Sequence, residues 1–148
     1  MFIRVAAAMV LGLMCGSELN VAAFAHPTLN NLPLEMHIRI RAALAKLFGR
    51  VMPFWFAGST ILNVLVLFPF AGLNGVAWRL AAIAAGSQIV AVVFSVIAPV
   101  PINNRIIRWT PESLPSDWRA QEHRWDVYHW GRTCGLIVAF VVLLLSFR

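Results

Sequence analysis

The residues best suited to chemistry in this sequence are ionisable side chains surrounded by apolar ones. Glu18 lies within the apolar stretch Val5–Ala25, shortly before His26. At about 100° per residue on a helix, Glu18, Ala22, Ala25 and His26 share one face. An ionised carboxylate at bilayer depth costs about 2.5–3.5 kcal/mol. Glu18 must therefore bond to a partner on another helix or hold a proton, and it is a candidate for proton transfer.

A second group of candidate residues lies between Trp118 and Arg132. If this segment is helical, Trp118, Trp125, His129 and Arg132 fall on one stripe. Such a stripe offers a base, a cation and aromatic rings that could stack on a planar ligand. The alternative interpretation is an aromatic belt with arginines at the start of a membrane helix.

The segment Pro101–Arg105 joins a proline to two asparagines and an arginine. We expect the proline to end a helix, with Asn103 and Asn104 bonding to its free carbonyl groups. Asn103 and Arg105 could also hold a carbonyl or oxyanion.

Metal binding is the less favoured use of the acidic and histidine residues. The sequence lacks an HExxH motif and has one carboxylate–His pair at i, i+3 spacing rather than two. The histidines lie at the ends of apolar runs, whereas haem ligands lie between helices. We therefore expect no metal or other cofactor. The candidate ligands are Glu18, His26, Glu122, His123, Asp126 and His129.

The composition indicates that a bilayer surrounds these residues. The chain is 60% hydrophobic and 12% charged, whereas soluble domains carry roughly 25% charged residues. We predict an all-α fold, with one domain over residues 1–148 that forms a bundle of four transmembrane helices. We expect Pro53 in the first turn of the second span, an interfacial helix at Met36–Phe48, and Pro99 and Pro101 ending the third span. The predicted spans are about 5–25, 53–69, 80–98 and 127–147.

The distribution of basic residues predicts the orientation. Nine of them lie in the first and third loops or at the start of the last span, and Arg4, Arg79 and Arg148 lie on the other side. The positive-inside rule then puts both loops in the cytoplasm of a multi-pass cell-membrane protein, with both termini outside. The net charge of +6 suits lipid head groups rather than nucleic acid. The nine are Arg39, Arg41, Lys46, Arg50, Arg105, Arg108, Arg119, Arg124 and Arg132.

The first span also has features of a signal peptide, with Ala23–Ala25 as a cleavage site. Glu18 and Asn20 interrupt its apolar stretch, so we expect the span to be retained. The two cysteines, Cys15 and Cys134, form no CxxC pair, and we expect both to be free thiols. Assembly into a homo-oligomer stays open.

Several motifs stand out along the chain: Gly16–Glu18 with His26-Pro27, Gly49–Trp55, Pro101–Arg105, Trp118, Arg124–Asp126, His129 and Arg132. In this order they resemble the motifs of one family, the anthrone oxygenase-like family of small four-helix membrane proteins. The sequence resembles its largely uncharacterised bacterial branch most. In that family, named fungal and actinobacterial members oxidise anthrones to anthraquinones with O₂ and without a classical cofactor.

The resemblance implies a membrane-embedded oxygenase or oxidase of a lipophilic aromatic substrate, such as an anthrone or a quinol. We expect His129 or Glu18 to abstract a proton, and Arg105, Asn103 and Arg132 to stabilise the resulting oxyanion. Trp118 and Trp125 would stack on the rings, and His26 would contact the substrate.

These side chains would have to converge at the cytoplasmic ends of the helices. The main alternative is a non-catalytic accessory subunit or lipid-binding module. A weaker one is a small proton-coupled transporter that uses Glu18.

Overall fold

A computed structural model describes all 148 residues and contains helices, turns and loops without a strand. The predicted all-α fold is confirmed. The chain passes through α1 (Phe2–Asn20), a π-helical turn (Val21–Ala25), α2 (His26–Leu29), α3 (Leu34–Leu65), α4 (Gly75–Ile97), α5 (Pro99–Ile106) and α6 (Trp118–Leu145). Two 3₁₀ turns, Pro69–Ala71 and Pro111–Ser113, lie in the loops.

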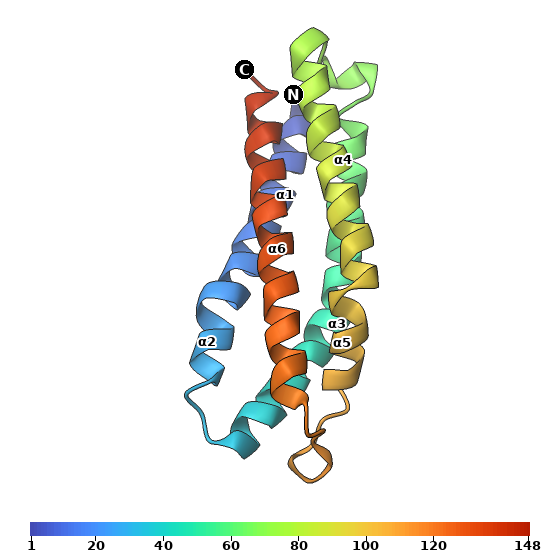
Figure 1. Cartoon of the computed structure of the whole chain (residues 1–148). Coiled ribbons are helices and arrows are strands. Elements are labelled where there is room, and N and C mark those ends of the chain that lie inside the picture. Colours follow the sequence, from blue (N-terminus) through green and yellow to red (C-terminus); the bar gives the residue numbers. More distant parts are fainter.

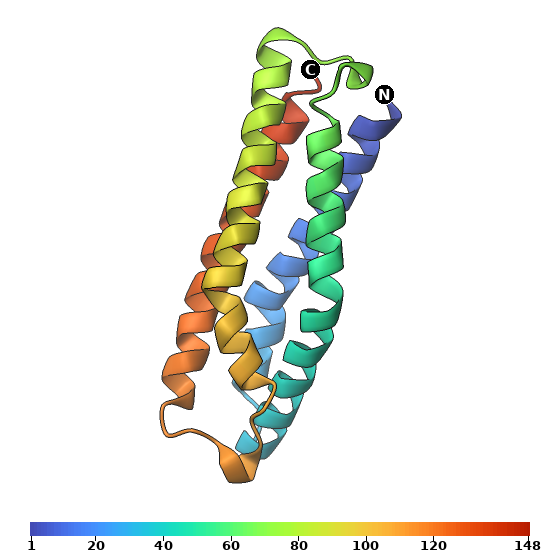
Figure 2. The ribbon, with the colours of Figure 1, turned by 90° about the vertical axis from the view of Figure 1, so that its right-hand side faces the viewer.

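The long helices lie side by side along the length of the molecule (Figure 1). α6 packs mainly on α4 and α1, and α3 packs on α1 and α4. Both chain ends and the loop between α3 and α4 are at one end, where the Arg4 guanidinium lies 5.5 Å from the Phe147 ring centre. The loop after α2 and the loop before α6 are at the other end (Figure 2).

Three helical segments are long and apolar enough to cross a membrane: Phe2–Leu29, Gly75–Ile97 and Trp118–Leu145. They coincide with the first, third and fourth predicted spans, and they indicate a membrane protein. α3 is not among them, because even the last 18 residues of α3 include Arg50, Pro53 and Asn63, which lower their mean hydropathy. The crossing by residues 53–69 stays a prediction.

The predicted place of Pro53 in the first turn of its helix is wrong. Pro53 lies inside the 32-residue α3 rather than in its first turn, and the predicted interfacial helix Met36–Phe48 is the first half of that same helix. A proline in a helix interior removes one hydrogen bond, which would run from residue 53 to the carbonyl of Gly49. No turn sequence separates the two halves, so the helix continues through this position.

The end of the third span is partly as predicted. α4 ends at Ile97, but a second helix, α5, begins directly at Pro99. Pro99 and Pro101 fit its first turn, where backbone N–H groups have no helical acceptor. Asn103 therefore lies within a helix and does not bond to the end of α4. Its side-chain amide donates to the carbonyl of Ala45 in α3, at 3.2 Å, and joins α5 to α3.

The apolar core forms two clusters along the molecule. The larger one includes Leu11, Met14 and Leu136, all fully buried, and lies towards the end with the chain termini. The smaller one includes Ile38 and Ile106, and it lies towards the other end. The candidate chemical residues lie around the region between the two.

Candidate active site among the helices

Glu18 has the buried partner that its position in an apolar helix requires. Its side chain is 3% exposed, and its Oε2 accepts from Nε of Arg132 at 2.9 Å and from Nη2 at 2.5 Å. Arg132 also donates to Oγ of Ser95 in α4, at 3.2 Å, and lies 5.3 Å from the Phe56 ring centre. One guanidinium thus contacts α1, α3 and α4 from its place on α6.

His129 is held by the same pair. Its Nε2 donates to the backbone carbonyl of Glu18 at 3.0 Å, and its Nδ1 accepts from Arg132 at 2.9 Å. These partners fix a neutral ring with the proton on Nε2. Because both ring nitrogens are engaged and the residue is 2% exposed, His129 has no nitrogen free for a ligand.

The π-helical turn sets the direction of His26. On an uninterrupted α-helix, Glu18 and His26 would be about 80° apart. In the turn at Val21–Ala25 the backbone hydrogen bonds join residues i and i+5, so one full turn of the helix takes an additional residue. This brings His26 back to the face of the helix that carries Glu18. Both side chains consequently contact α6: Glu18 meets Arg132, and His26 meets Asp126.

His26 forms a histidine–aspartate pair. Its Nδ1 donates to Oδ1 of Asp126 at 2.9 Å, and its Nε2 accepts from the guanidinium of Arg41. Arg41 also donates to Asp126 at 3.3 Å, and its Nε lies 3.0 Å from Oε1 of Glu122. Burial lowers the pKa of Arg41, the two carboxylates oppose that change, and the guanidinium stays charged.

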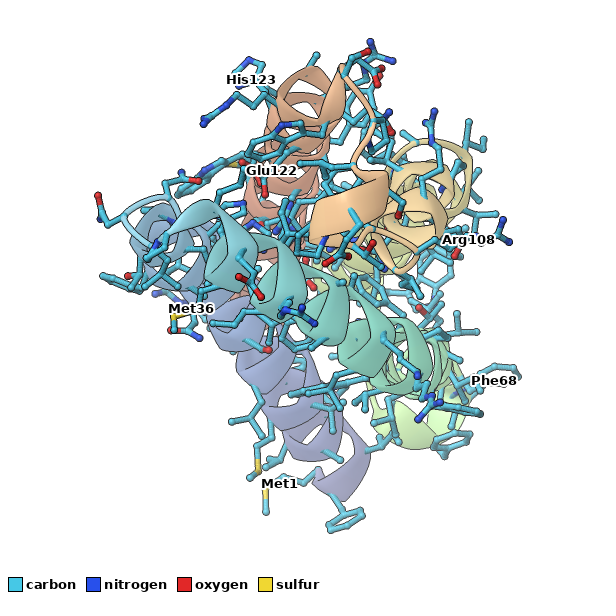
Figure 3. All side chains as sticks on the ribbon, turned by 90° about the horizontal axis from the view of Figure 1, so that it is seen from below. Met1, Met36, Phe68, Arg108, Glu122 and His123 are labelled. Atoms are coloured by element: carbon cyan, nitrogen blue, oxygen red, sulfur yellow. The ribbon has the colours of Figure 1, made fainter.

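His37 completes this group of residues. Its Nδ1 lies 2.8 Å from the carbonyl of Leu29, and its Nε2 lies 2.9 Å from Oε1 of Glu122. Both partners are acceptors, so the two bonds form together only when the ring carries both N–H protons. Seen from that end, Glu122 points towards the other helices, whereas His123 points outwards (Figure 3).

Trp125 packs against Arg41 and His129. The Arg41 guanidinium lies 4.4 Å from its ring centre, and the His129 ring stacks on it at 4.6 Å with 13° between the planes. Trp118 lies elsewhere, 5.7 Å from the His37 ring. Trp125 lines the cavity described next, and Trp118 lies outside it.

A cavity of about 300 Å³ adjoins these residues. Its apolar wall comes mainly from α3 and α4, with Met52, Phe56 and Val92 as examples. Its polar wall comprises His26, Arg41, Ser95, Asn103, Asn104, Trp125 and Arg132. A second cavity of about 90 Å³ lies on the other side of His26 and is lined by residues such as Asp126 and His129.

The structure brings together most of the residues that the sequence indicated. Glu18, His26, Trp125, His129 and Arg132 form one connected group, and Asn103 lies on the cavity wall. Glu18 and His129 lie behind that wall. Arg105 is exposed on α5. No three of the acidic, histidine and cysteine side chains are grouped to share a metal ion.

The sequence analysis missed Arg41 as a site residue and did not consider His37. One signal could have revealed them: His37 and Arg41 are one turn apart on α3, and Glu122 and Asp126 are one turn apart on α6. A histidine and an arginine on one helix and two carboxylates on another, at matching spacing, indicate facing helices.

Fold and site together define a helical membrane protein that encloses a network of paired charges beside an apolar cavity. The family model described as "Anthrone oxygenase" matches residues 43–142. This match covers well over half of the chain, which belongs to the anthrone oxygenase family. The match includes Asn103, Asp126 and Arg132, and it begins after Glu18 and His26. No curated protein and no solved structure matches the chain.

Proposed function

We propose that this protein is a membrane-embedded oxygenase that oxidises a lipophilic aromatic substrate of the anthrone or quinol type with O₂. Membership of the family supports an oxygenase-like activity. The observation that carries the proposal is the cavity of about 300 Å³, which is apolar along one side and bounded by His26, Arg41 and Arg132 on the other. Such a cavity suits a ring system that carries one polar edge.

In the first step, Nε2 of His26 takes a proton from the ring carbon opposite the substrate carbonyl. Asp126 accepts a hydrogen bond from Nδ1–H of His26 and stays ionised, so it fixes the tautomer and stabilises the imidazolium. The substrate displaces Arg41 from Nε2. The electron pair left on carbon delocalises onto the carbonyl oxygen, and Arg41 and Arg132 stabilise that oxyanion.

In the second step, O₂ is the oxidant. The carbanion gives one electron to O₂, and the two radicals combine into a C–O bond. The peroxide anion takes the proton from His26. Loss of the second proton on that carbon, with cleavage of the O–O bond, leaves a carbonyl group and one water molecule. The sum is CH₂ + O₂ → C=O + H₂O, and His26 is regenerated.

His26 is favoured over Glu18 and His129 as the base because it lies on the cavity wall. Glu18 and His129 are held by Arg132 behind that wall, and they would position its guanidinium. Asn103 and Trp125 line the cavity and would contact the substrate there. Catalytic roles for Glu18 and His129, and contacts of Arg105 and Trp118 with the substrate, stay predictions.

The test is oxygen consumption and quinone formation by the detergent-purified protein with a hydroxylated anthrone. We expect His26→Gln to lower turnover by about 10²–10⁴-fold, the usual contribution of a general base. The matched control is His123→Gln, since His123 is exposed on α6, outside the cavity lining, and should retain the wild-type rate.

Wild-type turnover by His26→Gln would remove His26 from the mechanism, and a loss confined to His129→Gln would restore His129 as the base. An inert wild-type protein would favour the accessory or lipid-binding role. Metal content and the visible absorption spectrum of the same sample test the direct reaction with O₂, because a bound metal or haem would replace it.

A further inference from the structure

The larger cavity reaches the side of the molecule between α3 and the α4–α5 pair. Its lining includes Pro53 and Ala57 of α3, which are exposed, and Val96 and Val100 of α4 and α5. The exposed fractions of Val96 and Val100 are 62% and 40%. Residues that both line a cavity and face outwards mark its rim, so we place an opening between these two pairs.

The surface around this opening is apolar. Phe54 and Ile61 on α3 are 80% and 59% exposed, and Val93 and Ile97 on α4 are 51% and 71% exposed. In a membrane protein, such a surface faces lipid hydrocarbon. Polar residues meet the opening only at its end towards the membrane surface, where Asn104 belongs to the cavity lining.

The smaller cavity is a poor route for an aromatic substrate. It holds about 90 Å³, and its lining is mostly polar, with Asn30, Asp126 and His129 among the residues. A polar space of this size suits water rather than a ring system. The ring of His26 contributes to both cavities and lies between them.

We propose that the opening between Pro53–Ala57 and Val96–Val100 is a lateral entrance through which the substrate enters the site directly from the bilayer. This inference rests on the proposed function and specifies its substrate class. The substrate is an uncharged, planar compound that dissolves in lipid, with its carbonyl or hydroxyl groups on one edge. That edge enters towards Arg132 and His26, and the rest of the ring system lies against the apolar wall.

The test measures binding rates in lipid vesicles. An uncharged hydroxyanthraquinone serves as the probe, and quenching of the protein's tryptophan fluorescence reports its binding. Ala57→Phe and Val96→Phe narrow the entrance from either side. Ile61→Phe and Val93→Phe are matched controls, because they place the same side chain on the same helices at lipid-facing positions outside the cavity lining.

We expect each rim variant to lower the association and dissociation rates together, on the order of tenfold for a barrier raised by about 1.4 kcal/mol. The equilibrium dissociation constant should stay near that of the wild type, because the site itself is unchanged. Both control variants should bind at wild-type rates.

Unchanged rates in both rim variants, or equal slowing in the controls, would overturn the entrance. The binding assay needs no turnover, so it separates this inference from the proposed function. If the rim variants slow binding but the protein never oxidises an anthrone, the proposed oxygenase activity is refuted and the lateral entrance is supported. If the rim variants bind the probe at wild-type rates and turnover is normal, only the lateral entrance is refuted. A wild-type protein that does not bind the probe would overturn both.

Discussion

Glu18, Glu122 and Asp126 are carboxylates set among helices, and each lies against a cation that belongs to a different helix. Glu18 faces Arg132, and the other two face Arg41. The two ring nitrogens of His37 contact the carbonyl of Leu29 and the carboxylate of Glu122. In a medium of low dielectric, an unpaired charge costs far more than in water. These contacts therefore hold the helices in one arrangement.

The Glu18–Arg132 pair can be tested by a double-mutant cycle. Glu18→Ala leaves a guanidinium that is 10% exposed without its carboxylate, and breaking a buried pair costs about 3–5 kcal/mol. We expect the free energy of unfolding in mixed micelles to fall by that order. The double variant Glu18→Ala/Arg132→Ala should lose less than the sum of the two single variants, because it removes both charges.

The exposed pair Glu35–Arg39 provides the control for this cycle. Its side chains are 67% and 62% exposed, and such surface pairs contribute about 0–1 kcal/mol. Glu35→Ala should leave stability almost unchanged. Strictly additive effects of Glu18→Ala and Arg132→Ala would show that this pair does not couple α1 to α6.

Residue types alone indicated that Glu18 needs a partner inside the protein, and Arg132 is that partner. They did not indicate that Arg41 would reach His26 and Trp125. Such contacts depend on which helices are neighbours and on their rotation, and the sequence pattern of one helix contains neither. The additional residue in the π-helical turn has no signal in Val21–Ala25 that we can identify.

At the scale of elements, hydropathy was sufficient for α1, α4 and α6, because each is a long apolar segment. It was insufficient for α3, because half of that helix is polar and Pro53 resembled a starting residue. Helix boundaries at prolines are ambiguous for a physical reason. A proline lacks the same N–H group whether it begins a helix or interrupts one, and only the contacts of its neighbours decide.

The loop between α3 and α4 depends on a glycine conformation. Gly72 has φ +73°, the left-handed region, where a side chain is strained even though no atom lies within 4 Å of an added Cβ. We expect Gly72→Ala to lower the free energy of unfolding by about 1 kcal/mol. Gly58→Ala is the control, because Gly58 is helical with equal space around it and alanine should stabilise the helix by roughly 0.5–1 kcal/mol.

Thermal unfolding in detergent measures both glycine variants. Opposite shifts of the melting temperature would confirm that backbone conformation, rather than space, determines the effect. A higher melting temperature of Gly72→Ala would show that residue 72 does not adopt the left-handed conformation in the purified protein.

At the scale of the whole molecule, the loops predicted to share a side do lie at the same end. The loop after α2 and the loop before α6 lie together, away from the chain ends (Figure 1). Assignment of that end to the cytoplasm follows from the excess of arginine and lysine there and stays a prediction. The same holds for the crossing by α3.

Cysteine labelling in intact cells tests both statements. In a Cys15→Ala/Cys134→Ser background, Asn31→Cys and Phe70→Cys place one thiol on either side of α3, at exposed positions. We expect a membrane-impermeant reagent to label Phe70→Cys at once and Asn31→Cys only after permeabilisation. Labelling of both from outside would mean that α3 does not cross, and the reverse pattern would invert the orientation. The background without added cysteine should stay unlabelled.

The π-helical turn also determines how this chain tolerates changes of length. Deleting one residue within Val21–Ala25 would let the helix close as an ordinary α-helix. Seven residue steps would then separate Glu18 from His26, about 700° on an α-helix, so both side chains would still face α6 within about 20° of their present directions. The loop between α3 and α4 can gain or lose a residue without rotating a helix. The first helix can therefore lose one residue between its two site residues with Glu18 still directed at α6, whereas an ordinary α-helix with the present residue count would turn Glu18 and His26 about 80° apart.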